Sequence, residues 1–239
     1  MQENEPADPI SRELASRGQE RTVHAMTQVA VDSSCVMDRL RSETRPHHDR
    51  AEQSGFGTLV MDGGLQMQQY LLHLIAWRRI LSHLEQALRT AEDQIVQQVW
   101  HEGLAKAPVL DADIDALTDG ELHWTDATAR AVASFIRLVD DLADRDPIAL
   151  LGVLYVLEGS TMGGSVMKPR IADQLQLEND RGLRYYGVYG NEVGVRFKAF
   201  RSTMAKSANG TGAEDRIVEA AKSTFDGVSE ILYSIANPA

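Results

Sequence analysis

Residues 155–167 read YVLEGSTMGGSVM, an apolar helical stretch that carries glycine at positions 159, 163 and 164. A glycine in a helix interior costs about 1 kcal/mol relative to alanine, so the three together cost about 3 kcal/mol. Two structural arrangements can offset this loss of helix stability. Another helix can pack closely against the bare backbone, or a flat ligand can approach where a Cβ atom would exclude it. The stretch alone leaves both open.

Helical spacing of apolar residues continues on both sides of this stretch, and no segment shows sustained strand alternation or a repeat of 20 to 50 residues. We therefore predict an all-α, single-domain helical bundle over residues 33–239. Residues 1–32 have weak periodicity and are expected to form a poorly ordered extension. The predicted helices cover residues 36–51 with a kink at Pro46, 65–89, 93–106, 111–117, 125–143, a glycine-interrupted helix from Pro147, 167–177, 190–206 and 214–235.

The composition excludes several classes of protein. The chain has 239 residues, of which 24 are Lys or Arg and 35 are Asp or Glu, and its net charge of -11 disfavours nucleic acid and anionic membrane surfaces. Apolar runs such as LLGVLYVL are far shorter than the roughly 20 residues that cross a bilayer. The N-terminus lacks the pattern of a secretory signal. We expect a soluble, cytoplasmic protein with no membrane partner.

Common catalytic and metal-binding motifs are missing. The single cysteine, Cys35, excludes a disulfide within the chain and a cysteine metal cluster. No HExxH, di-iron ExxH pair, GxSxG, P-loop or GxGxxG is present. His73, Trp77 and His83 share an apolar helix, and core packing with a solvated edge explains them. Two features remain, the histidine pair after Pro46 and the glycine-rich helix, and together they could enclose a flat group such as haem.

Three stretches resemble bacterial haem oxygenases, most closely the biliverdin-producing enzymes found with bacteriophytochromes. They are LRSETRPHHDRAE at 40–52, YVLEGSTMGGSVM at 155–167 and YYGVYGNEVGVRFKAF at 185–200. The similarity spans residues 36 to about 206. It implies a haem-oxygenase-like helical bundle with haem sandwiched between a proximal helix and a kinked distal helix.

The resemblance also assigns residues around the iron. His48 matches the proximal iron ligand, four residues after Thr44, whereas helical phase alone does not separate it from His47. Gly159 and Gly163 match the distal glycines that lie over haem, and Gly164 serves only the kink. Ser160 stands where animal enzymes carry an aspartate that orders water, so ordered water held by backbone groups is expected to serve instead.

Further candidates would bind the haem propionates. Arg41 occupies a position where the family places a basic residue, and Lys198 and Arg201 lie on the predicted late helix. Tyr189 could donate a hydrogen bond. Charge-assisted pairing with such groups would orient the macrocycle, although each of the late candidates could equally be a solvated or capping residue.

The resemblance implies oxidative cleavage of haem by O2 to biliverdin, with release of iron and carbon monoxide. No flavin or nicotinamide motif is visible, so an external reductant is implied, either a ferredoxin or a reductase, and a bacteriophytochrome could receive the product. A non-catalytic haem storage, transfer or sensing protein of the same fold is one alternative. A thiaminase-like or quinone-cofactor relative that binds no haem is another. The biliverdin regioisomer does not follow from the sequence.

Overall fold

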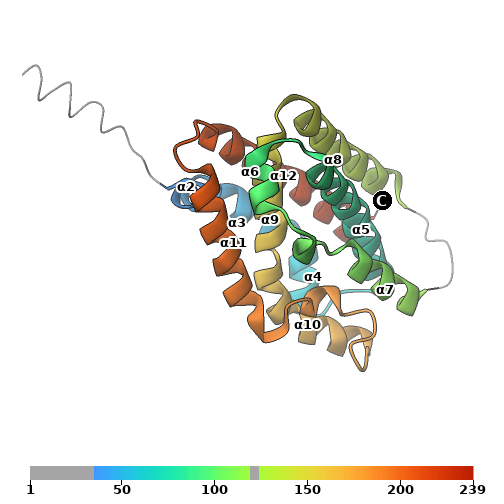
Figure 1. Cartoon of the computed structure of the whole chain (residues 1–239). Coiled ribbons are helices and arrows are strands. Elements are labelled where there is room, and N and C mark those ends of the chain that lie inside the picture. Colours follow the sequence, from blue (N-terminus) through green and yellow to red (C-terminus); the bar gives the residue numbers. More distant parts are fainter. Residues whose placement is uncertain (1–34, 119–123, 239) are drawn as a thin grey trace, which may run out of the picture. The chain divides into compact units, whose positions relative to one another are not determined.

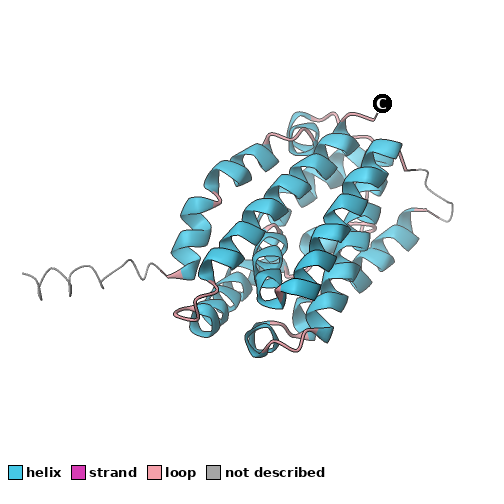
Figure 2. Ribbon diagram, turned by 90° about the horizontal axis from the view of Figure 1, so that it is seen from above, coloured by secondary structure: helices cyan, strands magenta, loops and turns pink. Residues whose placement is uncertain are grey.

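The computed structural model describes residues 35–118 and 124–238. The predicted extension over residues 1–32 therefore lies outside the described residues. Residues from Cys35 onward form one compact unit, and every regular element in the described ranges is helical (Figure 2). The prediction of an all-α fold is confirmed.

The elements follow one another in a simple order (Figure 1). They are α2 (Val36–Glu43), α3 (Arg45–Glu52), α4 (Phe56–Asp62), α5 (Met67–Thr90), α6 (Gln94–Val99), the 3-10 turn η1 (Glu102–Leu104), α7 (Ala107–Leu117), α8 (Asp126–Arg145), η2 (Pro147–Ala149), α9 (Leu150–Gly159), α10 (Thr161–Leu175), η3 (Tyr185–Gly187), η4 (Gly190–Glu192), α11 (Val193–Ala208) and α12 (Glu214–Ala236).

Most predicted helices are found within a few residues of their expected ends, and four predictions were wrong in detail. The short helix α4 was not predicted. The helix expected over 93–106 is divided into α6 and η1, because the backbone of Trp100 and His101 is extended. The helix expected from 111 begins at Ala107, with Pro108 in its first turn, where proline costs no hydrogen bond. Residues 167–175 continue α10 rather than forming a separate helix.

Helix α9 forms the centre of the core and packs against α12 (Figure 1). Its residues from Leu150 to Leu154 are all buried. The two helices approach closely at Gly152, where an added Cβ would lie 2.1 Å from the carbonyl oxygen of Ile217. This glycine is required by contact between two backbones.

The helical stretch Pro147–Leu175 is long and apolar enough to cross a membrane by those two criteria alone. However, 67% of its most apolar window is buried inside the protein. Burial of this kind is typical of a core helix, and α9 occupies that place here.

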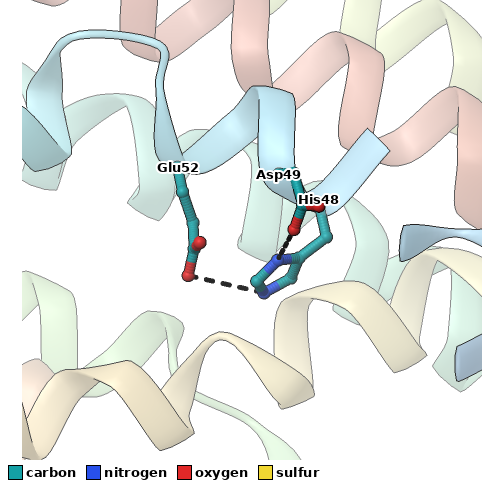
Figure 3. Close-up of side chains that lie close together, drawn as sticks. All are labelled: His48, Asp49 and Glu52. Carbon is teal, nitrogen blue, oxygen red and sulfur yellow. Dashed lines mark ion pairs between the residues drawn. The ribbon is translucent and has the colours of Figure 1, made fainter. Parts of the chain in front are cut away.

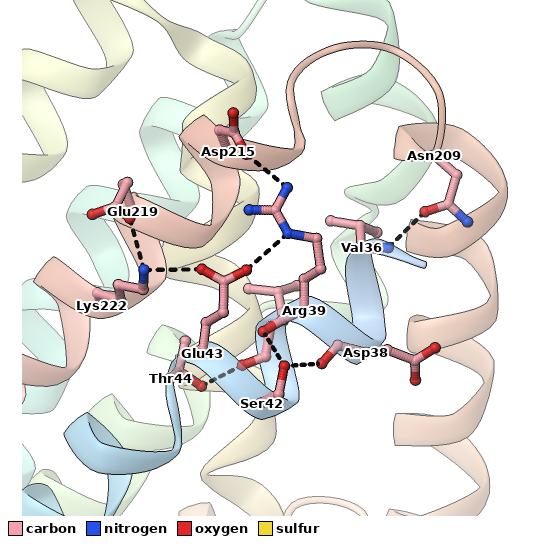
Figure 4. A network of polar contacts seen from close by, with 11 residues as sticks. Val36, Asp38, Arg39, Ser42, Glu43, Thr44, Asn209, Asp215, Glu219 and Lys222 are labelled. Carbon is pink, nitrogen blue, oxygen red and sulfur yellow. Dashed lines mark hydrogen bonds and ion pairs between the residues drawn. The ribbon is translucent and has the colours of Figure 1, made fainter. Parts of the chain in front are cut away.

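Polar contacts fasten α2 to α12 (Figure 4). Arg39 pairs with Glu43 at 2.8 Å and with Asp215 at 2.7 Å, and Lys222 reaches Glu43 at 3.0 Å. The hydrogen bonds from Arg39 and Lys222 lower the pKa of the Glu43 carboxyl. Single exposed ion pairs stabilise little, but this network crosses between helices. It fixes α2, and through it the start of α3.

Candidate functional site

The histidine pair follows a break between two helices, as predicted from Pro46. Helix α2 ends at Glu43 and α3 begins at Arg45, with Pro46 in its first turn. Proline lacks the N–H that would continue the helix ladder. The hydroxyl of Thr44 donates to the Leu40 carbonyl at 2.5 Å and closes the end of α2. The break turns α3 onto α12.

The two histidines have different surroundings. His47 Nδ1 lies 2.8 Å from an Asp226 carboxylate oxygen on α12, and Arg50 contacts the same carboxylate. The side chain of His48 is 47% exposed, and its ring packs edge-on against Phe225 with 5.6 Å between centroids. His47 therefore has a hydrogen-bond partner across the helix interface, whereas the His48 ring packs on Phe225 and neither of its ring nitrogens is hydrogen-bonded among the described residues.

Two carboxylates flank His48 on the same helix (Figure 3). His48 Nδ1 lies 3.6 Å from Asp49, and Nε2 lies 3.8 Å from Glu52. One ligand atom from each of the three residues lies within 4.8 Å of the others. Both distances exceed a hydrogen bond.

The glycine-rich stretch is broken at Ser160. Helix α9 ends at Gly159 and α10 begins at Thr161, and the Gly163 N–H bonds to the Ser160 carbonyl in a tighter turn than an α-helix makes. The Ser160 hydroxyl donates back to the Leu157 carbonyl at 2.8 Å. This is the kink that the sequence indicated, with the serine hydroxyl turned onto its own helix.

The three glycines do not share one purpose. A Cβ at Gly164 would lie 2.8 Å from the Tyr186 carbonyl oxygen, so this glycine is needed for packing. A Cβ at Gly163 would meet nothing within 4 Å, and one at Gly159 would make only ordinary contact with the Phe197 ring at 3.5 Å. Close packing therefore explains Gly164, and the expectation that this glycine serves only the kink was wrong. The Cβ position of Gly163 points into open space.

Two predicted cations lie near one another although they are far apart in the chain. Burial raises the pKa of the Tyr155 hydroxyl, and the charges of Arg201 and Arg41 oppose that rise, so both guanidinium groups act on this α9 residue. Within residues 35–118 and 124–238, neither arginine nor Lys198 forms an ion pair with a carboxylate. Arg41 of α2 and Arg201 of α11 thus both lie close enough to Tyr155 to affect its hydroxyl.

Tyr189 does not join this group. Its hydroxyl donates to Glu158 Oε2 at 3.3 Å, and its ring lies between Lys106 and the exposed Arg196. Burial and the Glu158 charge raise the pKa of the Tyr189 hydroxyl. The hydrogen bond to a propionate that the sequence suggested has a competing partner here.

Sequence reasoning missed one feature of the site, the buried ion pair of Lys106 with Glu158. The signal was a lone carboxylate at the end of the apolar run LLGVLYVL. Its partner lies 52 positions away in the chain. Nothing in the spacing of the sequence links the two residues.

A surface hollow of about 490 Å³ lies elsewhere, between α8 and α12. Its lining includes Arg130, Ser134 and Tyr233 and none of the predicted site residues. A much smaller hollow of about 10 Å³ borders α10 and is lined by Thr161, Ser165 and Tyr189 among others. That volume is about the space of one water molecule.

Comparisons with known proteins find relatives with a similar sequence and the same helical fold. A curated relative named "Heme oxygenase 1" from Nostoc sp. is 21% identical over 196 residues, which is 81% of this chain and 82% of that protein. The structure of the heme oxygenase from Leptospira interrogans has a TM-score of 0.74 at 20% identity, covering 84% of this chain and 99% of that one. Heme oxygenase-2 from Synechocystis sp., solved with heme and NO, has a TM-score of 0.76 at 20% identity, covering 84% and 85%.

The sequence match extends over nearly all the described helices. The family model described as "Heme oxygenase" matches residues 34–233. This range includes the histidine pair, the glycine-rich stretch and the late helix α11. The chain therefore belongs to the haem oxygenase family and is an enzyme of that class.

Proposed function

We propose that this enzyme binds haem between α3 and the α9–α10 kink and cleaves it to biliverdin, with release of iron and carbon monoxide. Two observations support the proposal. The ring nitrogens of His48 make no hydrogen bond among the described residues, and a Cβ at Gly163 on α10 would meet open space. Family membership supports haem degradation in general, and these residues supply the particular site.

The described residues fit a haem group. A flat macrocycle needs an imidazole on one face and a surface without side chains on the other, and His48 and Gly163 provide these. Its carboxylates need cations, and Arg41, Lys198 and Arg201 are free of carboxylate partners in the described ranges. The thiol of Cys35, at the start of α2, accepts a hydrogen bond from Asn209 and has no part in the proposed haem site.

Haem supplies the iron that activates O2 and the ring carbon that is oxidised. In our proposal one ring nitrogen of His48 binds the iron, and the other donates to Glu52 or Asp49, which fixes the tautomer and the plane of the ring. A neutral imidazole donates less electron density to iron than a thiolate does, so His48 would suit a haem that is itself the substrate.

On the opposite face, the backbone at Gly159 and Gly163 limits the space above haem. The Ser160 hydroxyl is bonded to its own helix, so protons are proposed to come from ordered water. Arg41 and Arg201, with Lys198 nearby, would orient the propionates. Electrons are proposed to come from a ferredoxin or reductase in the cytoplasm, and a bacteriophytochrome is a proposed recipient of biliverdin.

The activity is tested by reconstituting the protein with haemin, adding a reductant and catalase, and following the absorbance spectrum. We expect the Soret band to fall while biliverdin absorption rises. Chromatography of the product then identifies the regioisomer. A Soret band that persists without biliverdin would instead indicate a storage or sensing protein of the same fold.

The iron ligand is tested by two neighbouring substitutions. His48→Ala is expected to abolish the histidine-ligated haem spectrum, because no other described side chain replaces its ring. His47→Ala removes the contact to Asp226 and is expected to lower stability while leaving the spectrum in place. The opposite pattern of spectra would transfer the ligand role to His47.

A further inference from the structure

A buried ion pair lies directly behind the break between α9 and α10. Lys106 Nζ contacts Glu158 Oε2, and the two side chains are 2% and 0% exposed. Taking two charges out of water is unfavourable, and a well-packed apolar pair is often as stable as a buried ion pair. Stability alone therefore does not explain why charges occupy this place.

The pair joins three parts of the chain. Lys106 precedes α7 and also donates to the Leu104 carbonyl at 3.0 Å, which closes the linker after η1. Glu158 lies in the last turn of α9. Tyr189, before η4, donates to the same carboxylate oxygen at 3.3 Å. The carboxylate thus connects α9 to the linker before α7 and to the segment between η3 and η4.

Glu158 also takes part in the kink between α9 and α10. Glu158 immediately precedes Gly159, and its backbone carbonyl accepts the Thr161 hydroxyl at 2.7 Å across the break. Its second carboxylate oxygen, Oε1, has no hydrogen-bond partner among the described residues. A side chain anchored in the core therefore holds the backbone on which the distal glycines lie.

We propose that Glu158, held by Lys106, is a positioning residue that fixes the Gly159–Gly163 backbone over the haem and so limits the size of the ligand that fits on the distal side of the iron. This inference rests on the proposed function, because it requires haem against this backbone. The ion pair acts through the position of the kink and does not touch haem itself.

The test compares two ligands of different size on the ferric haem complex of the full chain. Cyanide is slender and imidazole is bulky, and both bind the same iron, so the ratio of their affinities reports the space under the kink. Lys106→Met and Glu158→Gln are each expected to raise the imidazole-to-cyanide affinity ratio at least about fivefold, the lower end of typical coupling between sites. Without the ion pair, the Gly159–Gly163 backbone can move and make room for imidazole.

Glu85→Gln is the matched control. Glu85 is also a buried carboxylate and accepts the backbone N–H groups of Lys106 and Ala107 at 2.7 and 3.0 Å, but it makes no hydrogen bond to α9. Its substitution is expected to change the ratio less than about twofold, well below the coupling expected for the pair. Circular dichroism on heating reports whether each variant is folded.

A double variant, Lys106→Met with Glu158→Met, keeps the test decisive if a single variant does not fold, since it replaces both charges with side chains of similar volume. It should fold and show the raised ratio. An unchanged ratio in the folded variants, with a normal histidine-ligated spectrum, would overturn this inference alone. Absence of a ligated spectrum in the unmodified protein would overturn the proposed function and this inference with it.

Discussion

Gly163 and Gly164 are neighbours in the chain but face different surroundings. The Cβ position of Gly164 points at the Tyr186 backbone, whereas that of Gly163 points into open space. Two alanine substitutions, one residue apart, therefore separate packing from ligand approach.

Gly164→Ala is expected to destabilise the protein by about 1–3 kcal/mol, because the Tyr186 carbonyl cannot move as a flexible side chain can. Gly163→Ala is expected to stabilise the haem-free protein by up to about 1 kcal/mol through helix propensity. It should weaken haem binding about tenfold, equivalent to about 1.4 kcal/mol. Denaturant unfolding and haemin titration measure the two effects, and a haem affinity unchanged by Gly163→Ala would place the ligand elsewhere.

The choice between His47 and His48 shows what a local pattern cannot provide. Both residues follow Pro46 and lie three or four residues from Thr44 and from Ala51, so their spacing does not separate them. In the structure their surroundings differ, since Asp226 contacts His47 from a helix 179 positions away. The resemblance to known enzymes favours the same residue, His48, for a different reason.

At the scale of elements, the crossing of α9 and α12 is the closest helix contact that we describe in the core. Their backbones meet at Gly152, and an added Cβ would overlap the Ile217 carbonyl and approach the Ala221 nitrogen at 2.8 Å. The helices cannot stay at this distance with any larger residue.

Gly152→Ala is therefore expected to cost more than a typical overpacking substitution, about 3 kcal/mol or more, or to prevent folding. Urea unfolding followed by circular dichroism measures the loss. Gly194→Ala is the matched control, since its Cβ would meet nothing within 4 Å on α11. Equal stability of the two variants would contradict the close crossing.

The break at Pro46 was predicted from a local cause, whereas the end of α6 at Trp100 was missed. Pro46 breaks α2 from α3 through its own missing donor. The extended backbone at Trp100 has no such local cause, since this residue is buried in the core. Tertiary packing there overrides the helical periodicity of residues 93–106.

At the scale of the whole molecule, His73 links several elements in the core. Its ring lies between Phe56 of α4 and Trp77 of α5, at 4.4 and 4.2 Å between centroids, and its Nε2 lies 2.8 Å from the Tyr186 hydroxyl. Burial lowers the pKa of His73 from 6.5 to about 3. The folded protein therefore holds this histidine neutral.

This burial predicts acid sensitivity. Between pH 6.5 and about 3 the unfolded chain binds a proton at His73 that the folded protein does not. The free energy of unfolding should fall as the pH is lowered through this window, by up to about 1.4 kcal/mol per pH unit from this residue. His73→Phe should flatten the dependence between pH 6.5 and 5, whatever its effect at pH 7. If the free energy of unfolding, measured in urea, depends equally on pH in both proteins, His73 is not the source of the acid sensitivity.

The sequence by itself determined the all-α class, most helices, the kink at Pro46 and the stretches that indicate the family. These follow from local causes, namely apolar periodicity, proline and glycine at particular positions, and motif spacing. Only the tertiary structure decided which glycine packs and which stays open, that Asp226 contacts His47, and that Lys106 lies beside Glu158. These contacts join residues distant in the chain, and their position depends on how every helix packs in the core.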